Sequence, residues 1–81
     1  MTNLRAQEKI DSGEAIDLSD FPQTNGDYVI TNNFVEGMDY YVTAENDWIR
    51  SIGRRKSDGV ILASTSNKFY QHPDFECIWL R

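Results

Sequence analysis

Cysteine and histidine are almost absent from this sequence of 81 residues, which contains one of each, Cys77 and His72. A single cysteine excludes a disulfide within the chain, and this pair cannot supply the ligand set of a structural zinc site. The acids also lack the Asp-x-Asp-x-Asp-Gly spacing of a calcium loop. We therefore predict no metal and no cofactor, and a reducing, cytoplasmic environment.

Long apolar runs are missing as well. No stretch approaches the roughly 18 apolar residues of a membrane-spanning helix, and the N-terminal sequence MTNLRAQEKIDSGE has no apolar segment typical of a signal peptide. Gly-rich phosphate loops, Gly-x-Ser-x-Gly motifs and recognisable pairs of catalytic carboxylates are also absent. These absences predict a soluble protein that binds no membrane and is not an enzyme.

The one enzymatic alternative is a thiol nucleophile at Cys77 with His72, five residues away, as its base. Such a pair needs an orienting group and an oxyanion site, and no motif marks either. Cys77 alternates with Phe75 and Trp79 on one face of a strand-like segment, where a free cysteine behaves as a small core residue. We therefore predict a structural role for Cys77 and a catalytic role for no residue.

Aromatic side chains and acids are what the chain has in abundance. Its four Phe, four Tyr and two Trp can each bury roughly 150 to 250 Å², enough for the core of a single domain over residues 1–81 and for an interface. The net charge of −5 is uneven, because residues 1–48 hold ten acids and two bases, and residues 49–81 hold three acids and six bases. Opposite charge on the two halves favours self-association.

The N-terminal part of the sequence predicts one short helix. Thr2 or Asn3 is a suitable N-cap, the helix extends to about Asp11, and Gly13 follows its end. Residues 14–21 alternate only in part, so we expect an irregular connection there, with a further helical turn as the alternative. Residues 21–27 contain proline and Asn-Gly, which are typical of turns.

Five segments have the composition or alternation of strands: residues 28–31, 38–44, 48–54, 60–63 and 75–80. The pair Asn32-Asn33 either forms a bulge that continues the first strand or turns the chain. The even-numbered residues from Met38 to Ala44 form the face of the second strand that we expect to be buried. Both faces of residues 48–54 carry apolar side chains, which predicts a central strand.

The Asp-Gly dipeptide in the turn of residues 56–59 predicts that the third and fourth strands form a β-hairpin, since glycine adopts the positive φ of such a turn. Short connections favour pairing between consecutive strands. We therefore predict an α+β fold, with a single antiparallel meander sheet of four to five strands and the short N-terminal helix packed on one face.

The first candidate binding site is the basic tip of this hairpin, which we define as Arg54, Arg55 and Lys56. Neighbouring cations on a rigid turn concentrate positive potential that attracts phosphate or carboxylate groups. The alternative is a solvated turn whose charges keep a sheet edge from pairing.

The second candidate site is the loop before the last strand, which Phe69 and Phe75 are expected to anchor. Long connections are often functional, and the alternative is an inert Ω-like loop. The outward-facing candidates of this loop are Lys68, Tyr70, Gln71 and His72.

The function predicted from these patterns is a small non-enzymatic module that binds a protein or a second copy of itself, as a dimer. An anion- or nucleic-acid-binding module that uses the basic tip is the alternative, although the net negative charge disfavours nucleic acid. A further alternative is an acidic inhibitor whose spaced carboxylates imitate the phosphates of DNA.

Overall fold

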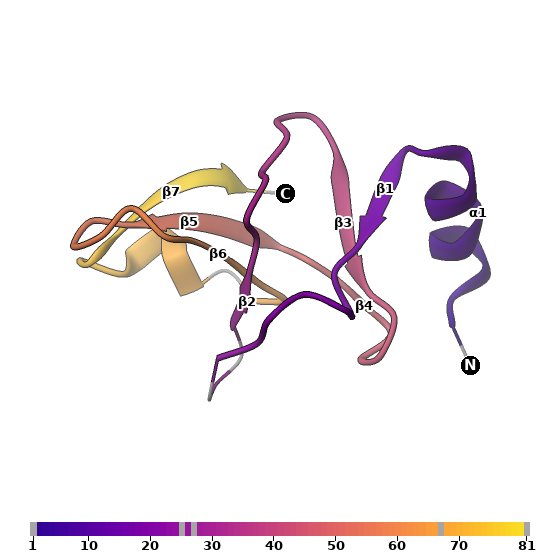
Figure 1. Ribbon diagram of the computed structural model, residues 1–81, viewed down its shortest axis with the longest axis horizontal. Coiled ribbons are helices and arrows are strands. Elements are labelled where there is room, and N and C mark those ends of the chain that lie inside the picture. Colours follow the sequence, from indigo (N-terminus) through magenta and orange to yellow (C-terminus); the bar gives the residue numbers. More distant parts are fainter. Residues whose placement is uncertain (1, 25, 27, 67, 81) are drawn as a thin grey trace.

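The computed structural model describes residues 2–24, 26, 28–66 and 68–80, and for Lys68 the backbone alone. Its elements form two sheets, and a single α-helix lies at one end of the long axis (Figure 1). The α+β class, the mostly antiparallel pairing and the helix packed on a sheet are thereby confirmed. In chain order the elements are α1 (Leu4–Ser12), β1 (Ala15–Asp17), β2 (Tyr28–Ile30), β3 (Asp39–Val42), β4 (Asp47–Trp48), β5 (Ser51–Arg55), β6 (Ile61–Ser64), the 3-10 helix η1 (Lys68–Gln71) and β7 (Phe75–Leu80).

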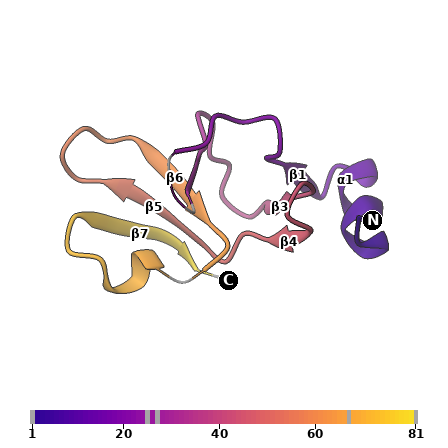
Figure 2. The ribbon, with the colours of Figure 1, turned by 90° about the horizontal axis from the view of Figure 1, so that it is seen from below.

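The strands are divided between two sheets, whereas the sequence predicted one. One sheet has the order β1-β3-β4 and the other β2-β6-β5-β7. Figure 2 shows β6, β5 and β7 of the second sheet side by side. The division arises because the strand expected over residues 48–54 is interrupted between β4 and β5. The backbone N–H of Ile49 donates to the carbonyl of Tyr40 in the first sheet, and that of Arg50 donates to Ser64 in the second. One extended segment therefore belongs to both sheets.

The connection expected after the helix contains a strand instead. Residues 15–17 form β1, which runs parallel to β3 with Ala15 beside Asp39. The end of β1 is fixed by Asp17, whose carboxylate accepts from the backbone N–H of Ser19 at 2.9 Å and from the hydroxyl of Thr43 at 2.9 Å. Burial raises the pKa of Asp17, but these hydrogen bonds outweigh it and leave the pKa below its ordinary value. Because three residues give little alternation, the side-chain pattern did not reveal this strand.

Two turn predictions have different outcomes. The stretch Asn32-Asn33 bends the chain after β2 ends at Ile30, so it acts as the turn and not as the bulge. The Asn-Gly turn expected within residues 21–27 falls partly outside the described residues. In its described part, Gln23 forms a bridge to Val29, and the backbone N–H of Thr24 donates to the carbonyl of Tyr28.

Helix α1 begins and ends as its caps predict. The side chain of Asn3 accepts from the backbone N–H groups of Arg5 and Ala6, and Gly13 ends the helix with a φ of 84°. The helix is joined to the three-stranded sheet through buried Ala6 and an ion pair of 2.6 Å between Lys9 and Asp39. A helix of this length is unstable alone, so these contacts with the sheet hold it in place.

Asn46, in the turn between β3 and β4, provides another contact at the start of this helix. Its side-chain oxygen accepts from the backbone N–H of Asn3 at 2.7 Å and from the hydroxyl of buried Tyr41. Its own φ is 53°, a left-handed conformation that asparagine tolerates better than most residues. One side chain thus connects the helix N-terminus, the turn and the core.

We predict that Asn46→Ala destabilises the protein by about 2 to 4 kcal/mol, because it removes both accepted hydrogen bonds. Alanine also has no polar side chain whose local hydrogen bonds offset the strain of a positive φ. Asn46→Gly should lose less, since glycine adopts this φ freely. Urea unfolding of the two variants and the native protein measures the difference. Equal stability of the alanine variant and the native protein would contradict this role for Asn46.

The main core lies between the two sheets and contains Tyr40, Val42, Ile49, Ile52 and Ala63, all fully buried. A register shift in the β5–β7 pair leaves Ile78 as an extra residue between Cys77 and Trp79. Both Ile78 and Trp79 consequently pack against this core.

The opposite face of the four-stranded sheet is covered by η1, whose Phe69 is buried as the sequence predicted. Phe69 lies directly over Gly53 of β5, where a Cβ atom would stand 2.7 Å from its Cγ and Cδ1 atoms. The ring of Phe69 also contacts Tyr28 and Phe75, with centroid separations of 5.1 and 4.8 Å. Glycine at position 53 is therefore what allows η1 to approach the sheet.

We predict that Gly53→Ala destabilises the fold by about 1 to 3 kcal/mol, as overpacking does in other cores. Alanine would otherwise be stabilising, because it reduces the entropy of the unfolded chain. Gly26→Ala is the matched control, since among the described residues its Cβ would meet Tyr28 alone, at 3.9 Å. Thermal or urea unfolding should show a loss for the first variant alone, and a stable Gly53→Ala protein would refute the close packing.

Candidate functional site

The basic tip is less cationic than its sequence suggests, because two of its three bases are paired with acids. Arg54 lies 3.4 Å from Glu76 of the neighbouring β7. Arg55 holds Asp58 with two hydrogen bonds, Nε to Oδ1 at 2.9 Å and Nη2 to Oδ2 at 2.6 Å. Lys56 is exposed and has no ion pair within the part of the chain that the structure describes. The tip therefore combines three bases with nearby acids, and its potential is largely balanced.

The Arg55–Asp58 pair closes the turn of the hairpin as well as balancing its charge. Asp58 also accepts from the backbone N–H of Val60 at 3.1 Å, and Gly59 has the positive φ, 75°, that the Asp-Gly pattern predicted. The hydrogen bond from Arg55 lowers the pKa of Asp58 to about 2, and the same bond raises the pKa of Arg55.

The loop residues predicted as a second site point in different directions. Tyr70 is 65% exposed and Gln71 is exposed too, as expected for contact residues. His72 is half-buried, with its ring edge-on to Phe75 at 4.7 Å, and its Nδ1 atom accepts from the backbone N–H of Asp74. The side chain of Lys68 lies outside the described residues. Tyr70 and Gln71 therefore form the accessible part of this site, while His72 shapes the loop.

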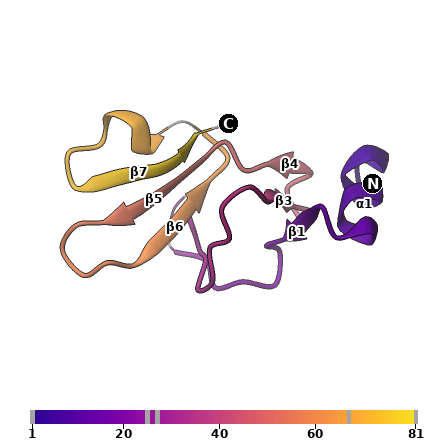
Figure 3. The ribbon, with the colours of Figure 1, turned by 90° about the horizontal axis from the view of Figure 1, so that it is seen from above.

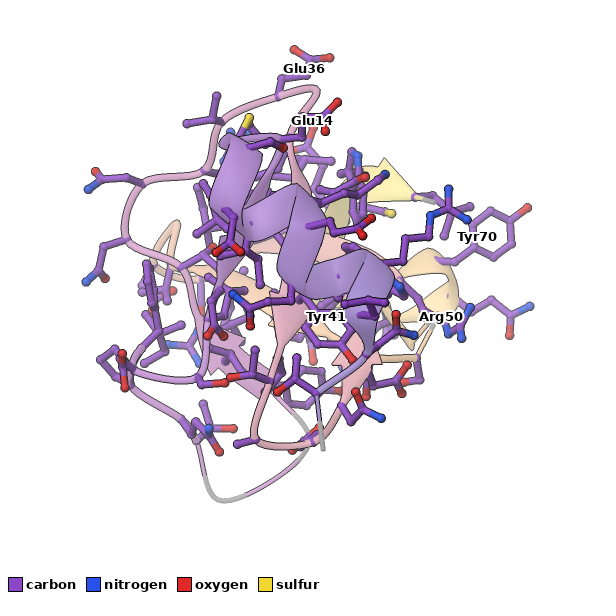
Figure 4. All side chains as sticks on the ribbon, turned by 90° about the vertical axis from the view of Figure 1, so that its right-hand side faces the viewer. Glu14, Glu36, Tyr41, Arg50 and Tyr70 are labelled. Atoms are coloured by element: carbon purple, nitrogen blue, oxygen red, sulfur yellow. The ribbon has the colours of Figure 1, made fainter. Side chains whose placement is uncertain are left out.

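Sequence reasoning missed the outer edge of β7. This strand is the longest of those described, and β5 is its only strand neighbour among the described residues (Figure 3). Near its end Leu80 is 49% exposed and pairs with Ser51, which follows exposed Arg50. Tyr70 projects outward from η1 on this side of the molecule, and Arg50 lies on the same side (Figure 4).

We name Arg50, Tyr70 and Leu80 the β7 surface. Tyrosine and arginine are enriched among the residues that contribute most to protein interfaces. The pairing order that brings β7 to the edge is not encoded in any single segment. The one signal for this surface in the sequence is therefore the apolar residue Leu80 at the end of the last strand.

Cys77 and His72 each have a separate hydrogen-bond partner in the described structure. The Sγ atom of Cys77 lies 3.6 Å from the carbonyl oxygen of Trp79, and His72 hydrogen-bonds within its own loop. The described residues contain no group of three or more His, Cys, Asp or Glu side chains arranged to hold a metal ion. No described helix has the length and apolar character needed to cross a membrane.

Comparison with protein-family models, with curated proteins and with solved structures found no match for the chain. The candidate surfaces are therefore judged on their geometry and chemistry alone.

We predict that the carboxyl of Asp58 titrates near pH 2 in the native protein and closer to its ordinary 3.8 in Arg55→Gln. Because the folded pKa is lowered, the pair stabilises the fold above about pH 4, and this contribution is lost as the pH falls through about 2. Side-chain carboxyl NMR shifts followed from pH 1.5 to 6 measure it. Arg54→Gln is the matched control and should leave Asp58 unchanged, whereas an unshifted Asp58 in the Arg55 variant would contradict the pairing.

Proposed function

We propose that this protein is a non-enzymatic interaction module that self-associates as a dimer through the β7 surface. The observation that carries this proposal is that exposed Leu80, at the end of the edge strand β7, pairs with Ser51 beside Arg50, on the side of the molecule where Tyr70 projects. Tyrosine and arginine are enriched at protein interfaces, and an exposed leucine beside them adds apolar area. Scattered single apolar residues would need no such explanation.

The β7 surface is suited to contact with an identical surface. Around a two-fold axis, residue i of one copy contacts residue j of the other, and j contacts i in return. A patch that holds both a cation and an aromatic ring can therefore pair with itself. Arg50 is only loosely paired with Asp47, at 3.8 Å, and its side chain is 57% exposed. It is therefore available to stack on Tyr70 of a second copy.

Association through side chains is favoured over continuous pairing of two β7 strands. The extra residue Ile78 bends the strand, and the ion pair between Glu76 and Arg54 places charges beside it. Bulges and charged residues on edge strands both discourage open-ended pairing with other chains. The same features limit association to a closed dimer and oppose growth into larger assemblies.

The basic tip supports the nucleic-acid alternative poorly. Two of its bases are already in ion pairs with Glu76 and Asp58. A polyanion would have to displace these acids before it gained the contacts that drive phosphate binding.

The dimer is tested by sedimentation velocity over a range of protein concentrations. We expect Leu80→Lys to weaken association about tenfold or more, since it introduces a cation into the apolar centre of the interface. Val35→Lys is the matched control, because Val35 is 48% exposed, almost as much as Leu80, and lies outside the β7 surface. Tyr70→Ala should weaken the dimer as well.

Two outcomes would overturn the proposal. If the native protein stays monomeric at every concentration, a second copy of the chain does not bind the β7 surface. Equal loss in the Val35 and Leu80 variants would show that association depends on general charge and not on the β7 surface.

A further inference from the structure

A depression lies on the four-stranded sheet between the end of β2 and the hairpin, separate from the β7 surface. Its volume is about 310 Å³, at the lower end of what small-ligand pockets occupy. The lining contains three half-buried aliphatic side chains, which come from β2, from β6 and from the hairpin turn, and three residues with polar side chains. The aliphatic residues are Ile30, Ile61 and Val60, the polar residues are Thr31, Asn32 and Arg55, and Gly59 completes the lining.

We propose that this depression binds a small carboxylate with a short, branched aliphatic body. Among the described residues, Arg55 is the single cation that lines it, and the remaining polar groups are uncharged. An apolar wall with one guanidinium matches a molecule that is apolar at one end and anionic at the other.

Arg55 can bind a second carboxylate while it holds Asp58. The pair with Asp58 uses Nε and Nη2, which form one edge of the guanidinium plane. The guanidinium has five N–H donors in all, and those on Nη1 have no acceptor among the described residues. Asp58 thus fixes the orientation of the side chain, and a further edge of the plane remains for a ligand.

The size and charge of the depression select against larger anions. Asp58 stands beside the guanidinium, so a dianion or a polyanion meets more repulsion than a monocarboxylate does. Thr31 is buried and bonded to the carbonyl oxygen of Ile61, which leaves exposed Asn32 as the uncharged side chain best placed to bond a ligand.

The site is tested with 3-methylbutanoate as probe, by following the backbone amides of residues 30–32 and 59–61 in NMR titrations. We expect saturable shifts with this carboxylate and none with 3-methylbutanamide, which has the same shape and no charge. A parallel titration with N-acetylleucine separates two sources of the ligand. Tighter binding of N-acetylleucine indicates the C-terminus of a polypeptide, and tighter binding of 3-methylbutanoate indicates a free acid.

Two substitutions with opposite expected effects distinguish binding from a structural role of the ion pair. Arg55→Gln should weaken binding about tenfold or more, because it removes the only cation. Asp58→Asn should tighten it about threefold, because the loss of a repelling charge outweighs the loss of the ion pair that orients Arg55, while its side-chain oxygen still accepts from Val60. Lys56→Gln is the control and should leave the affinity unchanged.

The proposal is overturned by equal shifts with the amide and the acid, or by an Asp58→Asn protein that is folded and binds as weakly as Arg55→Gln. These readouts do not depend on the oligomeric state, so a failure here is separate from a failure of the proposed dimer.

Discussion

The crossing of the chain from β4 to β5 is the constraint on which the rest of the structure depends. At Ile49 the backbone still bonds to β3, and one residue later, at Arg50, it bonds to β6. The side chain of Ile49 is fully buried between the two sheets together with Tyr40 and Ile52. Because the crossing is a backbone connection, hydrogen bonds on both sides of it fix the relative position of the sheets, together with the side chains packed between them.

This crossing decides which surfaces remain for function. It places β5 in the middle of the four-stranded sheet, with the main core on one face and Phe69 over Gly53 on the other. A small domain buries a limited fraction of its surface, and here both faces of its central strand are already covered. The accessible features are consequently at the margins of the sheet: the β7 surface at one edge, and the depression beside β2 towards the other.

Local features of this fold could be predicted from the sequence because each depends on a few neighbouring residues. The caps Asn3 and Gly13, the positive φ of Gly59 and the anchoring by Phe69 all follow from residue type and position. The division into two sheets could not be predicted, because alternation in residues 48–54 is the same whether the segment bonds to one sheet or changes from one to another. The parallel strand β1 could not be predicted either, because a strand of three residues is too short to show a clear alternation of polar and apolar side chains.

The charge of the basic tip was also hard to predict from the sequence, because it depends on which acids the fold brings near. Arg54, Arg55 and Lys56 are adjacent in the sequence, and adjacency suggests a cationic patch. In the fold Arg54 meets Glu76 from another strand, a pairing that only the sheet order can reveal. Arg55 meets Asp58 three residues later, and that contact was within reach of sequence reasoning, since the turn folds the chain back on itself. An arginine held in this way keeps its full charge but has a fixed orientation and a restricted set of free donors. It is therefore better suited to one small, oriented anion than to the many phosphates of a nucleic acid.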